Sequence, residues 1–245
     1  MAGAVQPVSA ADLGLFGLVR RFPQIGAGLV VAKMRRRLWS TRTAIAVVRD
    51  LEAAPDTTPN DMHVEVVHPD SFEALPLLVE AASGVEYLYV RPIERTRQAR
   101  AGTISVARDG SGELMAFHFI HSAGDRDALE LVAPQMYPAL AADEVLTEAV
   151  YCLPAFRGRD VMPALLKATG ELLATRGTRR AFAYLDIANV ASLRMFRRAG
   201  YRPSGVERVD RYRFFRFSTI FRDLTPSTRA SWETSTQDAK RAGGS

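Results

Sequence analysis

Cysteine is almost absent from this chain: Cys152 is the one cysteine among 245 residues. A single thiol cannot form an internal disulfide, so the sequence excludes a disulfide-stapled fold and favours a reducing compartment. Long apolar runs are missing too, since a stretch such as IGAGLVVA at 25–32 is far shorter than the roughly 20 residues that span a bilayer. No charge precedes Asp12, so the basic segment of a signal peptide is lacking. These absences predict a soluble, cytoplasmic protein without a transmembrane segment.

Basic residues outnumber acidic ones, which gives a formal net charge of +5 and an isoelectric point near 9.6. Arginines gather in KMRRRLWSTR at 33–42 and again between Arg194 and Arg222. A basic surface attracts nucleic acid, anionic lipid, or a phosphate-bearing small molecule or carrier protein. For most of these arginines we favour a plain solvated surface.

The pattern along the chain divides it into three parts. Residues 1–61 read as an extension with two short helices over 10–38, a buried strand at 42–51 and a turn-rich linker at 52–61. Residues 62–226 form the main α/β domain, and the Ser/Thr/Ala/Gly-rich residues 227–245 form a disordered tail.

Within the main domain, the pattern predicts a strand at 62–68, a helix opening at Pro69, and a hairpin from Thr103 to His121 around the turn RDGSG. A βαβα run follows, with strands at 144–153 and 179–187 and helices at 163–176 and 190–199. Pro163 is expected at the first position of its helix, and Asn189 is expected to cap the second helix. One or two late strands lie in RVDRYRFFRFSTIFRDL.

The stretch CLPAFRGRDVMPALL at 152–166 resembles an anion-binding loop at a helix start. A helix start leaves four unpaired N–H donors and about half a positive charge. Gly158 lets a phosphate approach the backbone, and Arg157 and Arg159 add charged donors. Asp160 tolerates a left-handed backbone, but a carboxylate about 4 Å from a phosphate costs on the order of 1–4 kcal/mol. The loop therefore binds an anion only if Asp160 points to solvent or pairs with an arginine.

Two motifs in order resemble those of the GCN5-related N-acetyltransferases, the GNAT superfamily. The first is Cys152-Leu153-Pro154 followed by the run from Arg157 to Met162; the second is Asn189, Ser192, Phe196 and Gly200-Tyr201. The resemblance covers roughly residues 62 to 224. It implies an α/β fold with a mixed, mostly antiparallel twisted sheet flanked by helices, and transfer of an acetyl or other acyl group from acyl-CoA to a primary amine. The chain departs from the family pattern at Asp160 and Met162, where glycine or alanine is usual, and at Phe196, where many relatives have a tyrosine.

The resemblance also implies which residues form the site. The residues that would bind acetyl-CoA or another acyl-CoA are Cys152, Leu153, Arg157, Gly158, Arg159, Asp160, Val161, Met162, Asn189 and Ser192. Glu148 lies where relatives often place a general base, although a strand glutamate is as often simply exposed or ion-paired. Phe196 cannot donate a proton to the leaving thiolate, so that role is unfilled or passes to Tyr151, Tyr184, Tyr201 or solvent.

Other reactive residues point to less specific chemistry. Cys152 has no histidine beside it in sequence and reads as a small apolar residue of a buried strand. His118 and His121 lie on opposite faces of one strand, so they form no shared metal site. The aromatic and basic run RYRFFRF at 211–217 could hold single-stranded nucleic acid, but a late strand with exposed arginines is favoured.

Several functional alternatives remain open at this stage. The acyl donor could be an acyl carrier protein, whose acidic surface suits the arginines, or the domain could be a catalytically silent CoA-binding module. The acceptor is a small-molecule or peptide amine that the sequence does not identify, and the oligomeric state is not predicted. The extension could hold a partner, pair two chains or contact a membrane surface through GLFGLVRRF and KMRRR, although a packed extension is favoured.

Overall fold

The computed structural model describes residues 38–51, 62–81, 90, 93–94, 96–132, 136–214 and 216–235. The linker expected at 52–61 lies outside this part of the chain, as do the helices expected over 10–38 except for Leu38.

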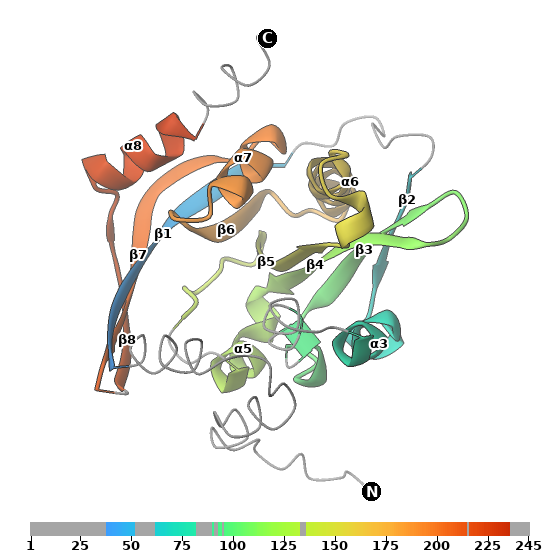
Figure 1. Cartoon of the computed structure of the whole chain (residues 1–245), viewed down its shortest axis with the longest axis horizontal. Helices are drawn as coiled ribbons and strands as arrows, with labels where there is room; N and C mark the ends of the chain where they lie inside the picture. Colours follow the sequence, from blue (N-terminus) through green and yellow to red (C-terminus); the bar gives the residue numbers. More distant parts are fainter. Residues whose placement is uncertain are drawn as a thin grey trace, which may run out of the picture.

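An eight-stranded sheet forms the centre of the protein, with strand order β2-β3-β4-β5-β6-β1-β7-β8 (Figure 1). All neighbouring strands pair antiparallel except β5 and β6, which pair parallel. This arrangement confirms the mixed, mostly antiparallel sheet expected from the sequence. The strands are β1 Trp39–Asp50, β2 Met62–Val67, β3 Thr103–Asp109, β4 Leu114–Ser122, β5 Glu144–Cys152, β6 Arg180–Asp186, β7 Arg202–Arg213 and β8 Arg216–Asp223.

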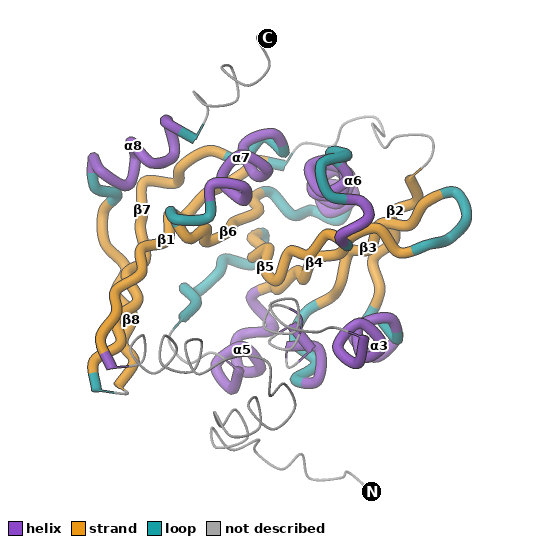
Figure 2. The backbone as a smooth tube through the Cα atoms, viewed as in Figure 1, coloured by secondary structure: helices purple, strands orange, loops and turns teal. Residues whose placement is uncertain are grey.

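Helices cover both faces of the sheet, with α6, α7 and α8 on one side and α3 and α5 on the other (Figure 2). Their bounds are α3 Ala74–Ala81, α5 Arg126–Val132, α6 Val161–Thr175, α7 Val190–Arg198 and α8 Pro226–Thr234. Short 3-10 turns precede three of them, namely η2 Pro69–Ser71, η3 Ala123–Asp125 and η4 Pro154–Phe156.

Each face of the sheet has its own apolar core. The larger core joins the sheet to α6, α7 and α8 and includes Ile45, Leu165, Leu193, Phe196 and Trp232. The smaller core packs α3 on β3 and β4 and includes Phe72, Leu75, Ile104, Phe117 and Phe119. Burying a side chain of this size contributes about 1.5–3 kcal/mol, so the two cores fix the sheet between its helical layers.

The hairpin expected from RDGSG is present as β3 and β4. The Asp109 carboxylate accepts hydrogen bonds from the backbone N–H groups of Ser111 and Glu113, both at 2.9 Å. Gly112 turns the chain back with φ +86°, which favours glycine. The expected cap of α7 is also confirmed, because the Asn189 side chain accepts from the N–H of Ser192 at 3.1 Å.

The strand expected at 42–51 lies inside the sheet. β1 pairs with β6 on one side and β7 on the other, and Ala44 to Val48 are buried. The uniform apolar run indicated this burial on both faces. A domain boundary near residue 61 remains a prediction, but this strand of the extension is a central part of the sheet.

The prediction of a disordered tail from residue 227 was wrong for residues 227–235, which are ordered. Pro226 begins α8, the Thr225 side chain caps it, and Trp232 is buried with 6% of its surface exposed. The composition of this segment is polar, but one large apolar side chain is enough to dock a short helix on the core. Residues 236–245 lie outside the described part of the chain.

A buried carboxylate connects β7, β8 and the start of α8. The Glu207 side chain is fully buried and accepts hydrogen bonds from Arg222 Nε at 2.7 Å and from Thr225 Oγ1 and N at 2.9 and 3.1 Å. Although burial alone would raise the pKa of Glu207, hydrogen bonds from Thr228, Thr225 and Arg222 lower it from 4.5 to about 2.

We therefore expect Glu207→Gln to lower the free energy of unfolding by about 2 kcal/mol at neutral pH, because hydrogen bonds to a charged group are lost. A carboxyl group with a lowered pKa stabilises the fold above its unfolded pKa and loses this effect as pH falls. The difference between wild type and variant should therefore shrink from pH 4.5 towards pH 2 in urea titrations.

Glu65→Gln is a matched control, because it removes a half-exposed ion pair with Arg108 that contributes about 1 kcal/mol or less. Equal losses in the two variants, or a pH-independent loss at Glu207, would contradict the role of the buried carboxylate.

Candidate active site

Strands β5 and β6 separate shortly after they begin to pair. Their parallel pairing runs from Glu144 and Arg180 to Leu146 and Phe182 and then stops. Further along β5, Ala149 has the left-handed value φ 50°, and the register with β4 shifts between Phe117 and Phe119. Such a bulge bends one strand away from its neighbour. A cavity of about 180 Å³ lies at the resulting gap.

Five elements line this cavity. One wall is β5 from Leu146 to Val150, and the facing wall is β6 from Tyr184 to Asp186. The start of α7 contributes Asn189 and Ser192, and the remaining side chains include Tyr137 from the loop before β5 and Arg208 from β7. Residues far apart in the sequence therefore meet at one point.

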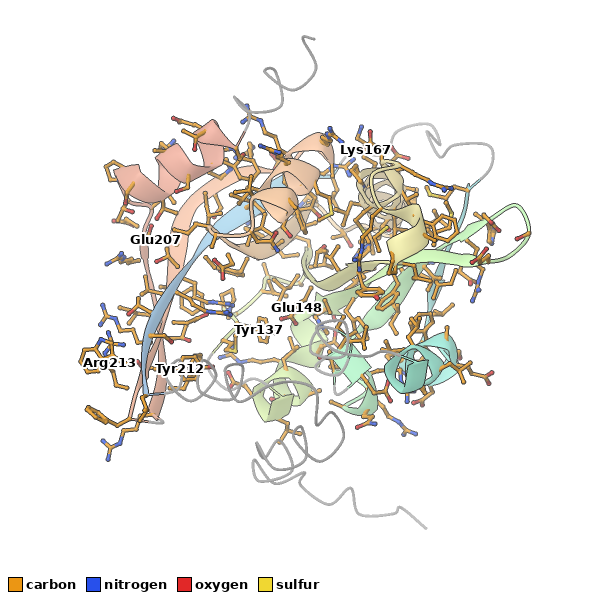
Figure 3. The ribbon with its side chains drawn as sticks, in the orientation of Figure 1. Tyr137, Glu148, Lys167, Glu207, Tyr212 and Arg213 are labelled. Atoms are coloured by element: carbon orange, nitrogen blue, oxygen red, sulfur yellow. The ribbon has the colours of Figure 1, made fainter. Side chains whose placement is uncertain are left out.

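Glu148 is the carboxylate of this cavity, and Tyr137 lies against it (Figure 3). The Tyr137 hydroxyl donates a hydrogen bond to Glu148 Oε1. Burial raises the pKa of Glu148 above its usual range, while the bond from Tyr137 and the charge of Arg208 limit the rise. A carboxyl group with a raised pKa in a cavity is suited to accept a proton near neutral pH.

Tyr137 was not predicted as a site residue. It lies in a loop without regular structure, eleven residues before Glu148, and no motif marks it. Burial, then the charge and hydrogen bond of Glu148, raise the pKa of Tyr137 far above its usual range. Its hydroxyl therefore keeps its proton and serves as a donor to the carboxylate.

Arg208 was also not predicted as a site residue. Its guanidinium lies 5.3 Å from the centre of the Tyr184 ring, and it donates to Asp210 and to the carbonyl of Met136, both at 3.1 Å. The contact with Met136 ties β7 to the loop that carries Tyr137. Arg208 thus supplies a buried positive charge and, through Met136, helps to place Tyr137.

The three tyrosines considered as proton donors for the leaving thiolate lie in different places. Tyr184 lines the cavity. Tyr201 is buried, with its hydroxyl 3.4 Å from Thr147 Oγ1 and its ring edge-to-face with Phe196. Tyr151 belongs to the smaller core, and its ring packs in a tilted arrangement against Phe117. Of these three, only Tyr184 is placed on the cavity wall in the described part of the chain.

The predicted anion-binding loop runs from the end of β5 to α6. Gly158 has φ +79°, and a side chain added there would meet nothing within 4 Å, so its backbone is open to solvent. Arg157 Nε donates to the Cys152 carbonyl at 3.0 Å, and the Arg159 guanidinium lies 5.6 Å from the Phe156 ring centre. Helix α6 begins at Val161, so Pro163 is not its first residue as expected but lies within the first turn.

The structure shows how the negative charge of Asp160 is compensated in the predicted anion-binding loop. It has the left-handed values φ 56° and ψ 15°, and its side chain does not cap α6. Instead the carboxylate forms an ion pair with Arg198 of α7. The partner is therefore not one of the adjacent arginines, and the negative charge is compensated beside the loop. Val161 and Met162 are buried and hold the helix start on the core.

The remaining predicted residues lie at the two walls of the site. Asn189 and Ser192 line the cavity from α7. Cys152 and Leu153 are half-buried beside the larger core. Burial raises the pKa of the Cys152 thiol, partly opposed by the charge of Arg157, so the thiol is a poor nucleophile.

The two strand histidines lie on opposite faces, as expected. His118 Nε2 is 3.2 Å from Thr169 Oγ1 of α6, whereas His121 Nε2 is 3.7 Å from Glu148 Oε2. Among the described residues, no group of three His, Cys, Asp or Glu side chains could hold a metal ion. No helix in that part of the chain is long and apolar enough to cross a bilayer.

Comparison with known proteins agrees with this geometry. The sequence profile of the acetyltransferase (GNAT) family matches residues 74–201, just over half of the chain. The chain therefore belongs to the GNAT family, as the two motifs indicated. A search of curated proteins found no match.

Solved structures with similar folds include three acetyltransferases. A GCN5-related glucosamine N-acetyltransferase region of a fungal multi-domain GH3 β-N-acetylglucosaminidase has a TM-score of 0.50 at 12% identity, covering 79% of this chain and 23% of that one. A GCN5-related N-acetyltransferase from Sphaerobacter thermophilus has a TM-score of 0.45 at 14% identity, covering 88% and 70%. A GNAT-family acetyltransferase from Novosphingobium aromaticivorans has a TM-score of 0.44 at 16% identity, covering 76% and 66%.

Identities this low concern the fold alone. The chain spans less than two thirds of the length of two of these three solved chains.

The backbone of Asp160 leads to a stability prediction. A residue with a Cβ pays about 1 kcal/mol or more in the left-handed region unless it is Asn or Asp. We expect Asp160→Ala to lower the free energy of unfolding by about 1 kcal/mol, while Asp160→Gly, which also removes the carboxylate, leaves it nearly unchanged. Urea denaturation measures both. Equal losses in the two variants would show that the ion pair with Arg198, not the backbone, determines the effect.

Proposed function

We propose that the protein is an acyl-CoA-dependent N-acyltransferase in which Glu148 is the general base. The observation that carries this proposal is the half-buried Glu148 carboxylate in the cavity between the diverging strands β5 and β6. Family membership supports acyl transfer in general, and the position of Glu148 supports a direct role in the chemistry.

The residues around the cavity suit an acyl-CoA. The loop offers an open glycine backbone and a helix start without a side-chain cap, and the charge of Asp160 is compensated by Arg198. Those features fit a pyrophosphate held by residues 157–162, with Cys152 and Leu153 beside the thioester arm and Asn189 and Ser192 on the facing wall. Bound acyl-CoA would supply the acyl group as a reactive thioester.

Glu148 would accept the proton that the acceptor ammonium must lose before its nitrogen can attack. Tyr137 holds one carboxylate oxygen and thereby orients the group. Burial raises the pKa of Glu148, which makes its carboxylate a stronger base than an ordinary glutamate. Tyr184, the cavity-lining tyrosine beside Arg208, is the candidate proton donor for the leaving thiolate.

The acceptor we propose is a primary amine of a small molecule or peptide that reaches the cavity from the Tyr137 side. A screen of amines, peptides and amino sugars with acetyl-CoA identifies it. Higher rates with an acyl carrier protein as donor would favour the carrier route. Binding of CoA without turnover across the screen would favour a silent binding module.

Glu148→Gln should lower kcat by roughly 10²- to 10⁴-fold, the usual contribution of a general base, and leave CoA binding unchanged. In the wild type, kcat/KM should rise with pH as Glu148 loses its proton, with the acid limb above the ordinary carboxyl range. Tyr137→Phe should move that limb to higher pH, because a hydrogen bond that lowers the pKa of Glu148 is removed.

Glu144→Gln is the matched control on the same strand. Glu144 pairs with Arg180 where β5 and β6 are still paired, outside the cavity. An equal loss of kcat in the two variants, or full activity in Glu148→Gln, would contradict the assignment of the base.

CoA binding itself tests the loop. Isothermal titration calorimetry should show that Asp160→Gly tightens CoA binding several-fold, because a negative charge is removed and Arg198 is released. Arg159→Ala should weaken binding by roughly three- to tenfold. Both effects should shrink at high salt, since exposed charges are screened over roughly 8–10 Å at physiological ionic strength.

Arg176→Ala is the charge-matched control, because Arg176 ends α6 at the opposite pole from the loop. Weaker binding in Asp160→Gly would mean that the carboxylate is itself a ligand. Equal losses in Arg159→Ala and Arg176→Ala would show that the loop is not part of the CoA site.

A further inference from the structure

His121 of β4 is a fully buried imidazole without a satisfied ring nitrogen. Its side chain has no exposed surface, and neither Nδ1 nor Nε2 has a hydrogen-bond partner in the described part of the chain. Leaving a buried polar group unpaired costs about 1–3 kcal/mol, so an orphaned group of this kind calls for a functional reason. The charged group that faces the imidazole is the carboxylate of Glu148.

The two ring nitrogens face different surroundings. Nε2 lies 3.7 Å from Glu148 Oε2, the carboxylate oxygen that Tyr137 does not bind. Nδ1 faces Gly102, where an added Cβ would lie 2.6 Å away, so no side chain fits between them. The glycine, at φ +75°, thus leaves room for the imidazole.

Asp125 is the other carboxylate that acts on His121, and its oxygens accept hydrogen bonds from other groups. Oδ1 accepts from the N–H of Gly102 at 2.9 Å, and Oδ2 accepts from Ser122 N and Oγ at 2.6 and 2.8 Å. We therefore assign the ring proton to Nε2, which faces the Glu148 carboxylate at 3.7 Å.

We propose that His121 is a positioning residue for Glu148, whose Nε2–H holds the second carboxylate oxygen from behind while Tyr137 holds the first. This inference rests on the proposed function for its catalytic meaning, since Glu148 is there the general base. A distance of 3.7 Å is too long for a hydrogen bond, and catalytic contacts of this kind are often long without substrate and tighten in the reactive complex.

The charges around the pair are consistent with a neutral donor. Glu148 faces His121 from β5 and Asp125 acts on it from η3, while Tyr137 and Arg208 act on Glu148 from the loop before β5 and from β7. Burial lowers the pKa of His121 to about 4, against the opposing charge of Asp125, so the imidazole stays neutral at physiological pH. A neutral imidazole can orient and stabilise the carboxylate without taking its proton.

The decisive experiment follows the ionisation of Glu148 in the free protein. Carboxyl ¹³C NMR titration of glutamate-labelled protein reports this pKa directly, with the Glu148 signal assigned by its loss in Glu148→Gln. His121→Leu should raise the midpoint by up to about one pH unit, because the Nε2–H dipole, 3.7 Å from Oε2, favours the ionised form even without a formed hydrogen bond. His121→Gln, which keeps an N–H near the position of Nε2, should restore most of the shift.

His118 provides a matched control. It lies on the same strand, is equally buried and contacts Thr169 on the opposite face. His118→Gln should leave the Glu148 midpoint unchanged, even if it lowers the melting temperature. His121→Leu should not lower the melting temperature comparably, because it replaces an unpaired polar group with an apolar one.

Kinetics then separates this inference from the proposed function. The acid limb of kcat/KM should move in His121→Leu by the same interval as the NMR midpoint. An NMR midpoint that does not move in His121→Leu overturns the positioning role, whatever the activity. A midpoint that moves in a protein whose turnover is unaffected by Glu148→Gln leaves the pairing of His121 with Glu148 intact and overturns the base.

Discussion

The loss of pairing between β5 and β6 is the constraint on which the rest of the site depends. The two strands are bonded only up to Leu146 and Phe182, and the left-handed Ala149 lies three residues beyond that point on β5. A left-handed alanine costs about 1–2 kcal/mol, and such strain is usually retained where function needs it. Here it opens the cavity and places Glu148 on its wall. A regular strand at this position would close the gap and remove the site.

Buried charge is the second feature of the site, and it is compensated in steps. Glu148 contacts Tyr137 and lies 3.7 Å from His121, and Arg208 supplies a positive charge that limits the rise in the pKa of Glu148 caused by desolvation. Arg208 is in turn held by Asp210 and by the carbonyl of Met136. At the loop, Arg198 compensates Asp160 in the same manner but at the surface, where the contribution to stability is small. The proposed chemistry therefore rests on the set around Glu148, and the proposed anion binding on the exposed set at the loop.

Three elements near the two ends of the sequence, β1, β8 and α8, support the strands around this site. β1 fills the place between β6 and β7, so the strand that carries Tyr184 stays paired along one edge after its pairing with β5 has stopped. Glu207 joins β7, which carries Arg208, to β8 and the start of α8. These elements fix both cavity walls, which is a requirement for a general base whose geometry must be held closely.

Much of the fold was determined by local sequence signals. The turn RDGSG, the Asn189 cap, the apolar run of β1 and the two ordered motifs indicated elements and family because each acts over a few neighbouring residues. The same signals identified Glu148 and the loop as site candidates. The cap and proline at Thr225 and Pro226 were present but were outweighed by the polar composition around them.

Only the tertiary structure decided which side chains meet. Tyr137, His121 and Arg208 come from a loop and two strands, and nothing in their local sequence places them beside Glu148. Strand neighbours in a sheet are chosen by long-range packing, so the insertion of β1 and the partner of Asp160 on α7 could not be read from spacing. Burial and charge compensation arise from the assembled fold, and they are the quantities that turn a strand glutamate into a candidate base.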